Sequence, residues 1–133
     1  MELITPAEEE RLHEKLISYY ERVYPDVKFQ KQKITLGLNE IGEVFYTYPG
    51  EESEATFTEK TEEILKVCDR GYCTPVILIK KKDSYILVDG HRRLKVAWDL
   101  KLEWPALLII PEKEIKLGIE KIITGKIKDI WKK

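Results

Sequence analysis

An apolar run that ends at Val88 leads into an Asp-Gly pair and then into a cluster of basic residues. The run is rich in β-branched and large apolar residues, which is typical of a short strand. Asp89-Gly90 is a strong turn pair, because glycine accepts a positive φ and aspartate can bond nearby amides. The pattern that follows is helical, and its first turn contains His91, Arg92 and Arg93.

This helix start has the composition of an anion site. Basic residues at a helix N-terminus have the wrong sign for the helix dipole, which favours anions there. If an anion is bound, free amides, the dipole and cationic side chains all converge on it. The pattern therefore indicates phosphate binding by Gly90, His91, Arg92 and Arg93. One alternative stays open: the three side chains could be a solvated face or could pair with carboxylates elsewhere.

Helical phase separates Arg93 from its neighbours. At about 100° per residue, Leu94 and Ala97 lie at the centre of an apolar arc, while His91 and Arg92 lie on the polar side. Arg93 falls inside the apolar arc. An unpaired buried charge is costly, so we expect the Arg93 guanidinium to reach a carboxylate or a ligand.

The first 48 residues predict a helix and a hairpin. Thr5-Pro6-Ala7-Glu8 has an N-cap, a proline in the first turn and a capping-box glutamate. Residues 33–38 alternate as a strand, and Asn39 to Gly42 could turn the chain into a second strand over residues 43–48. The amphipathic stripe of the helix, which ends before Pro25, contains Leu12, Leu16, Tyr19, Tyr20 and Val23.

The rest of the chain alternates helices and strands. A helix is expected from about Thr58 to Arg70, followed by a strand over residues 76–79 that is buried on both faces. Another buried strand is expected over residues 106–110, and a helix from Pro111-Glu112 onward. The alternation predicts an α+β or α/β core. The isoleucines at helical spacing in the last region are Ile115, Ile119, Ile122 and Ile123, and a short tail follows with Ile127, Ile130 and Trp131.

Composition is that of one globular domain of 133 residues, 43% hydrophobic and 35% charged. No apolar run reaches the roughly 18–20 residues of a membrane span. With no signal-peptide pattern, we expect a cytoplasmic protein without membrane partners. Cys68 and Cys73 have no further Cys or paired His nearby, so no metal site is expected. Glu outnumbers Asp and Lys outnumbers Arg, a composition typical of thermophile proteins.

The net charge of −1 hides an asymmetry. Residues 1–63 contain seven Lys/Arg and fifteen Asp/Glu, whereas residues 64–133 contain sixteen and nine. The basic half could form a nucleic-acid face. The favoured interpretation is that the two halves neutralise each other on packing, or that both are ordinary solvated surface. The C-terminal lysines that could form a basic stripe are Lys116, Lys121, Lys126, Lys128, Lys132 and Lys133.

From about Thr58 to Ile110 the chain resembles the ParB/sulfiredoxin-like superfamily. The matching residues are Gly71, Pro75, the run Asp89-Gly90-His91-Arg92-Arg93, Ala97 and Pro105. The resemblance implies an α+β fold with a small mixed sheet covered by helices. It places a single domain over residues 1–133, with a core at 58–110, an N-terminal helix and hairpin at 5–48, and C-terminal helices at 112–132. It also implies that the motif grips a nucleotide's phosphates.

The branches of this superfamily differ in activity. Sulfiredoxins have a catalytic Cys where this chain has Gly90, and partition proteins of the ParB type add a helix-turn-helix region and an Asn-Gln-Arg box that are missing here. The chain is most similar in motif to archaeal free serine kinases, although it lacks their additional C-terminal region. The similarity lies in Val88-Asp89-Gly90-His91 and in Pro49-Gly50-Glu51, which resembles the Pro-x-Glu that these kinases have upstream of the preceding helix. It implies that Glu51 is a general base on an acceptor hydroxyl and that Asp89 assists at the reaction centre.

The predicted function is therefore nucleotide-phosphate binding, with ADP, ATP or CTP as ligand and Mg²⁺ as an accompanying ion. Phosphoryl transfer to a small hydroxyl-bearing acceptor, or hydrolysis of the nucleotide, would use Glu51 and Asp89. The alternatives are a ParB-like DNA-binding or partition-related module and a regulatory module without catalysis. DNA binding is less favoured, because the C-terminal lysines fit the solvated face of an amphipathic helix.

Overall fold

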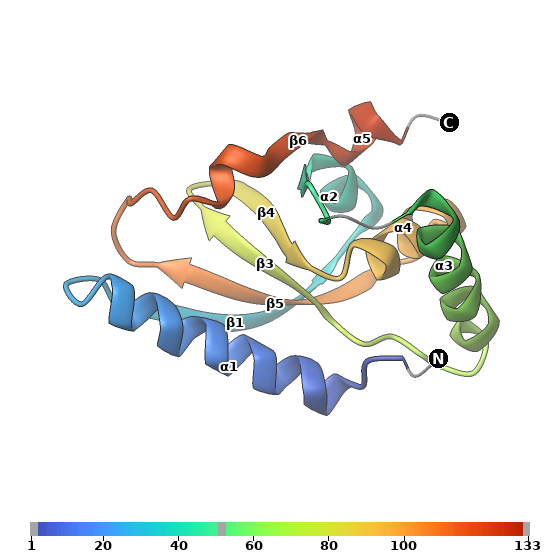
Figure 1. Ribbon diagram of the computed structural model, residues 1–133, viewed down its shortest axis with the longest axis horizontal. Helices are drawn as coiled ribbons and strands as arrows, with labels where there is room; N and C mark the ends of the chain where they lie inside the picture. Colours follow the sequence, from blue (N-terminus) through green and yellow to red (C-terminus); the bar gives the residue numbers. More distant parts are fainter. Residues whose placement is uncertain (1–2, 51–52, 132–133) are drawn as a thin grey trace.

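The computed structural model describes residues 3–50 and 53–131. Its centre is one mixed sheet with the strand order β1-β5-β3-β4-β2-β6 (Figure 1). Strands β5 and β3 are parallel, as are β4 and β2, and the other neighbours are antiparallel. The expected α+β class is confirmed. The strands are β1 (Phe29–Leu36), β2 (Phe45–Thr47), β3 (Val76–Lys81), β4 (Ser84–Asp89), β5 (Trp104–Pro111) and β6 (Ile123–Lys126).

Helices cover both faces of the sheet. Helix α1 packs on one face through Ile17 and Tyr20, whereas α2, α4 and α5 pack on the other (Figure 1). Helix α3 lies against α4. A helix on each side makes the sheet's centre a two-sided core. The helices are α1 (Pro6–Val23), α2 (Leu38–Glu43), α3 (Glu54–Cys68), α4 (His91–Leu100), the 3-10 turn η1 (Ile119–Ile122) and α5 (Ile127–Ile130).

Strand β3 shows the two-sided burial expected of it. Val76 and Leu78 belong to the core cluster beneath α4, and Ile77 and Ile79 to the cluster beneath α1. All four side chains are fully buried. An unbroken apolar run is what a strand covered on both faces requires.

The helix starts follow from capping chemistry. Thr5 Oγ1 accepts the Glu8 amide at 3.2 Å, and Glu8 Oε1 accepts the Thr5 amide at 3.1 Å, so the predicted capping box is confirmed. Helix α3 begins at Glu54, four residues before the predicted start. The reason is Ser53, whose hydroxyl accepts the Thr56 amide at 3.1 Å and caps this turn.

The predicted hairpin over residues 33–48 is wrong. Strand β1 pairs with β5 at one edge of the sheet, and three strands (β5, β3 and β4) lie between it and β2, which pairs with β4 and β6. The residues predicted as the hairpin turn, Asn39 to Gly42, lie in helix α2 instead. This helix is favoured because the Glu40 carboxylate accepts the Gly37 amide at 2.9 Å and Ile41 is fully buried. Helix α2 packs on the same face of the sheet as α4, and the chain then enters β2 near the opposite edge of the sheet from β1.

The predicted helix from Pro111-Glu112 is also wrong. Strand β5 continues to Pro111, and no helix forms before η1. Gly118 has a φ of 91°, and the chain then forms β6, which pairs with β2. The isoleucines Ile115, Ile119 and Ile123 pack against the α1 side of the core from this largely non-helical path. Their spacing matched a helix, but their burial against the sheet decides the conformation.

Candidate functional site

Strand β4 ends at Asp89, and Gly90 forms the N-cap of α4 with a φ of 105°. A Cβ at this position would lie 2.5 Å from Val76 Cγ1, so no other residue fits without movement. Gly90 also has no side chain to cap the helix. The first-turn amides of this ten-residue helix are therefore not satisfied by an N-cap side chain, and they retain the partial positive charge that attracts anions.

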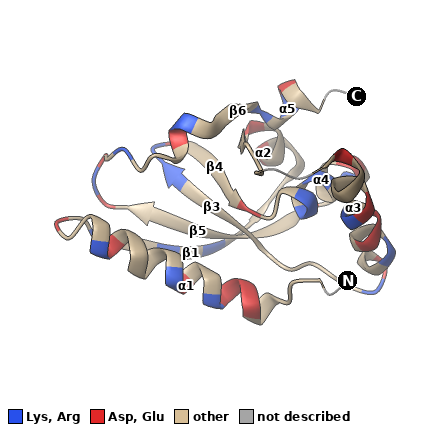
Figure 2. Cartoon of the chain, viewed as in Figure 1, with Lys and Arg blue, Asp and Glu red and all other residues tan. Residues whose placement is uncertain are grey.

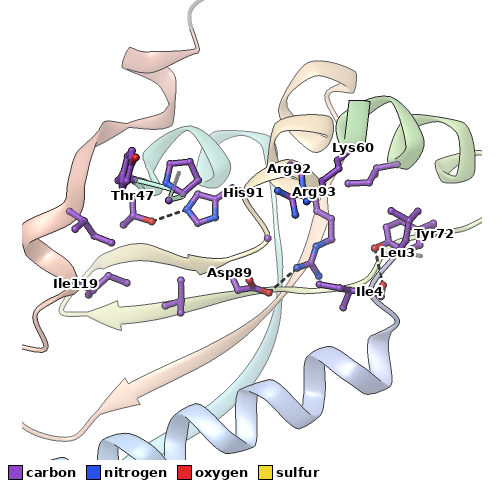
Figure 3. Close-up of a pocket in the computed structure, with 17 residues that line it drawn as sticks. Leu3, Ile4, Thr47, Lys60, Tyr72, Asp89, His91, Arg92, Arg93 and Ile119 are labelled. Atoms are coloured by element: carbon purple, nitrogen blue, oxygen red, sulfur yellow. Dashed lines mark hydrogen bonds and ion pairs between the residues drawn. The ribbon is translucent and has the colours of Figure 1, made fainter. Parts of the chain in front are cut away.

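A pocket of about 540 Å³ opens at this helix start. Asp89 and Arg92 line it from the β4–α4 junction, and Lys60 lines it from α3 (Figure 3). Its walls also include apolar side chains, among them Val88 from β4 and Ile119 from η1. We call this cavity the α4 pocket. The four residues of the phosphate-binding prediction, Gly90, His91, Arg92 and Arg93, all line it, as does Asp89.

His91 is held by a defined chain of hydrogen bonds. The Thr47 hydroxyl donates its one hydrogen to the Leu87 carbonyl oxygen at 2.7 Å. The 2.9 Å contact between Thr47 Oγ1 and His91 Nε2 is therefore donated by the imidazole (Figure 3). In the neutral ring Nδ1 is then the acceptor.

Burial lowers the pKa of His91 from 6.5 to about 4, against the opposing pull of Asp89. His91 is thus neutral near pH 7. His91 can orient a ligand and accept a hydrogen bond, but Arg92 and Lys60 supply the positive charge on the pocket wall.

Arg93 turns away from solvent and into the protein. Its Nη1 donates to the Pro75 carbonyl oxygen at 2.6 Å, and its Nη2 contacts Glu9 Oε2 at 2.8 Å and Asp89 Oδ2 at 3.0 Å. The prediction that this guanidinium must reach a carboxylate or a ligand is confirmed. We call Glu9, Arg93 and Asp89 the buried cluster. Arg93 fixes the floor of the pocket, and its donors on both terminal nitrogens are engaged within the protein.

Glu9 was missed because the predicted face of α1 is rotated. Tyr19 and Val23 are about half exposed, whereas Tyr20 is buried as predicted, and the buried face also contains Glu9, His13 and Ile17. The spacing of four residues from 9 to 13 to 17 was the available signal. Its first two members are polar, so a search for apolar periodicity passes over it.

Lys60 was also missed. It lies on a helix rich in charged residues, where the sequence offers nothing to distinguish it from Lys66. Only the packing of α3 against α4 brings Lys60 to the pocket.

Glu51, the predicted general base, lies outside the described residues. The residue before it, Gly50, lines the α4 pocket together with Asp89.

Of the C-terminal lysines, the four that the structure describes, Lys116, Lys121, Lys126 and Lys128, do not lie on one helix. Lys126 lies at the end of β6 and Lys128 on α5, and both donate to Glu43, at 2.8 Å and 2.5 Å. We call Glu43, Lys126 and Lys128 the surface cluster. Figure 2 shows Lys and Arg spread over most elements. Both clusters join the acidic half of the chain to the basic half, in agreement with mutual neutralisation.

Within residues 3–50 and 53–131, no three His, Cys, Asp or Glu side chains gather in a way that could hold a metal ion. Among the same residues, no helix has the length and apolar character needed to cross a membrane. The chain matches no protein-family model and no curated protein.

Proposed function

We propose that the chain binds a nucleotide through its phosphates at the start of α4. The observation that carries the proposal is Gly90, which opens an N-terminus without a side-chain cap into a pocket lined by Arg92 and Lys60. Backbone amides, the helix dipole and two cationic side chains converge on one space there, and this combination favours a multiply charged anion.

The size and walls of the pocket support a nucleotide over a bare phosphate. Small-molecule pockets typically have volumes of about 300–1,000 Å³ and mix apolar walls with a few polar groups. At about 540 Å³ the α4 pocket is much larger than one phosphate group. Val88, Ile119 and Ile122 provide apolar surface beside the charged groups, which suits the base or sugar of a nucleotide.

We further propose that the domain belongs to the ParB/sulfiredoxin-like superfamily. Its order of helix, buried strand, hairpin, strand, Gly-led basic helix and buried strand corresponds to α3, β3, β4, α4 and β5. The support is the order of elements and the position of the Gly90 turn between two buried strands.

Phosphoryl transfer to a small hydroxyl compound is the activity we propose for this site, with Glu51 as base and Asp89 assisting. Two observations support it: Gly50 lines the pocket, and the Asp89 carboxylate is held at its floor by Arg93. Mg²⁺ would accompany the nucleotide, because this ion is usually bound through substrate phosphates with few protein ligands. A module that binds the nucleotide without catalysis is the competing outcome.

Calorimetry with ADP, ATP and CTP, with and without Mg²⁺, tests the binding proposal. At least one nucleotide should bind, and Arg92→Ala should weaken it roughly ten- to hundred-fold, since a charge-assisted hydrogen bond is lost. Lys60→Met should weaken binding in the same direction. Matched controls are Arg70→Ala and Lys66→Met, which remove exposed charges of α3 and its C-terminal end outside the pocket. Absence of binding by all three nucleotides would refute the proposal.

Phosphoryl transfer is tested separately with Glu51→Gln. Turnover of the bound nucleotide should fall roughly 10²–10⁴-fold with nearly unchanged affinity, as expected when a general base is removed. Glu54→Gln is the control, because it removes an acidic residue from the first turn of α3 outside the pocket. Binding without turnover in the wild type would leave a nucleotide-binding module and remove the kinase assignment.

A further inference from the structure

The buried cluster contains two carboxylates on one guanidinium nitrogen. Glu9 reaches Arg93 Nη2 from α1, and Asp89 reaches the same nitrogen from the end of β4. If both carboxyl groups were ionised, the cluster would have a net charge of −1 below the pocket. A buried charge without compensation is strongly unfavourable, and two carboxylates that share one site cannot both ionise easily.

The surroundings decide which carboxyl group takes the proton. The Glu9 side chain is 1% exposed, and its Oε1 has no hydrogen-bond partner among the described residues. The Asp89 side chain is 34% exposed and faces the pocket. Ionisation is favoured where water and donors reach the oxygens, and disfavoured where they do not. The proton therefore belongs on Glu9 and the charge on Asp89.

The electrostatics of Glu9 agree with this assignment. Burial is the main reason why its pKa is raised, to about 8, and Asp89 adds to the increase while Arg93 opposes it. The charged groups that act on the Glu9 carboxyl are thus Asp89 on β4 and Arg93 on α4. His13, one turn further along α1, directs its Nε2 to the Leu108 carbonyl oxygen at 2.8 Å.

We propose that Glu9 is a positioning residue of the α4 pocket, which stores the one proton of the buried cluster so that Asp89 stays ionised and fixed at the helix start. The positioning role rests on the proposed function, whereas the location of the proton does not. With Glu9 neutral, the charges of Arg93 and Asp89 cancel, so an incoming phosphate meets no net negative charge from the floor. Loss of that proton would place a negative charge beneath the phosphate site and weaken anion binding.

The location of the proton is tested by ¹³C NMR of the side-chain carboxyl groups, with the two signals assigned from Glu9→Gln and Asp89→Asn. Glu9 should remain protonated at pH 7 while Asp89 is ionised. An ionised Glu9 at that pH, or a protonated Asp89, would overturn the proposal.

Stability gives a second readout that needs no ligand. Glu9 is protonated in the folded state and ionised in the unfolded state between the two pKa values, so the contribution of Glu9 to wild-type stability should fall as pH rises from about 5 to 8. Relative to Glu9→Gln, which mimics the neutral acid, the folding equilibrium constant should fall by up to about tenfold per pH unit. Glu10→Gln, on the exposed face of α1, is the matched control. Equal pH slopes for wild type and Glu9→Gln would contradict the assignment.

The positioning role is tested with ADP as probe between pH 7 and 9, above the titration of its phosphates at about pH 6. Wild-type affinity should weaken by up to about tenfold as the pH rises from 7 to 9, because the protonated fraction of Glu9 falls by that factor around a pKa of about 8. Glu9→Gln should remove this dependence. If the ADP affinity of wild type and of Glu9→Gln falls equally with rising pH, Glu9 does not position the site. If ADP does not bind at any pH, the positioning role falls together with ADP as the ligand, and the NMR titration still decides where the proton lies.

Discussion

The buried cluster and the surface cluster each contain three charged groups, but the pKa of the glutamate is raised in the first and lowered in the second. Each joins three charged groups, two of one sign on one of the other, and each connects segments more than 80 residues apart. In the buried cluster the two like charges are carboxylates, and Glu9 and Arg93 are almost completely enclosed. In the surface cluster the like charges are lysines, and all three side chains are between about one third and one half exposed.

The two clusters differ in how far their carboxyl groups are exposed to water. Removal from water raises the pKa of Glu9, although Arg93 lies within hydrogen-bonding distance. At the surface, hydrogen bonds from Lys126 and Lys128 hold the pKa of Glu43 at about 2, because little desolvation opposes them. A carboxyl group beside a cation therefore keeps its proton near neutral pH only where the protein also excludes water. Exposed pairs of the same geometry contribute little to stability.

The largest effect should come from Arg93→Met. This change leaves Asp89 and Glu9 without their shared cation, and breaking a buried pair of this kind costs about 3–5 kcal/mol. Urea unfolding followed by circular dichroism measures it. Lys128→Met, the corresponding change in the surface cluster, should leave the unfolding midpoint nearly unchanged. Similar losses in the two variants would show that burial does not distinguish the clusters.

Substitution of Gly90, in the turn between β4 and α4, should cause the next largest loss of stability. Gly90→Ala forces a side chain into a positive φ and against Val76, so we expect a loss of about 2–4 kcal/mol from strain and steric overlap together. Gly71→Ala is the control, because Gly71 has a φ of 91° but open space around its missing Cβ. It should lose only about 1 kcal/mol. Urea midpoints for the two variants separate strain from overlap, and equal losses would remove the steric argument.

His91 should give the pocket region a pH dependence opposite to that of Glu9. Its pKa is lowered on folding, from 6.5 to about 4, so the unfolded state binds the proton first as pH falls. The contribution of His91 to stability should decrease from pH 6.5 towards pH 4, by at most about 1.4 kcal/mol per pH unit. In thermal unfolding, His91→Gln should reduce the dependence of the melting temperature on pH between pH 6.5 and pH 4. An unchanged dependence in the variant would show that His91 is not the group responsible.

The smallest effect should be that of Glu43→Gln in the surface cluster. Because the pKa of Glu43 is lowered on folding, from 4.5 to about 2, its contribution is present above pH 4.5 and is lost as pH falls towards 2. The difference in melting temperature between wild type and variant should be small at pH 6. It should vanish at pH 2 or in about 1 M salt, where the Debye length falls to about 3 Å. A difference that persists in salt would contradict a purely screened interaction.

Local features of this chain were determined by the sequence alone. The capping box at Thr5, the turn at Gly90 and the two-sided burial of β3 follow from backbone preferences and short-range periodicity, which involve residues within a few positions. The same reasoning showed that Arg93 needs a partner, because its place on the apolar arc of a helix implies burial.

Only the tertiary structure decided which partners meet and which groups lose their water. The cation of Arg93 is paired with Glu9, which lies 84 residues away on a face that the apolar pattern did not reveal. The neutrality of His91 depends on its enclosure and its bond to Thr47, which comes from a strand that was expected in a hairpin elsewhere. The C-terminal isoleucines had the spacing of an α-helix, but the chain there forms an irregular segment, the 3-10 turn η1 and strand β6. Ile115, Ile119 and Ile123 pack against the α1 side of the core from these different conformations. Desolvation and long-range contact depend on the whole fold, so neither can be read from neighbouring residues.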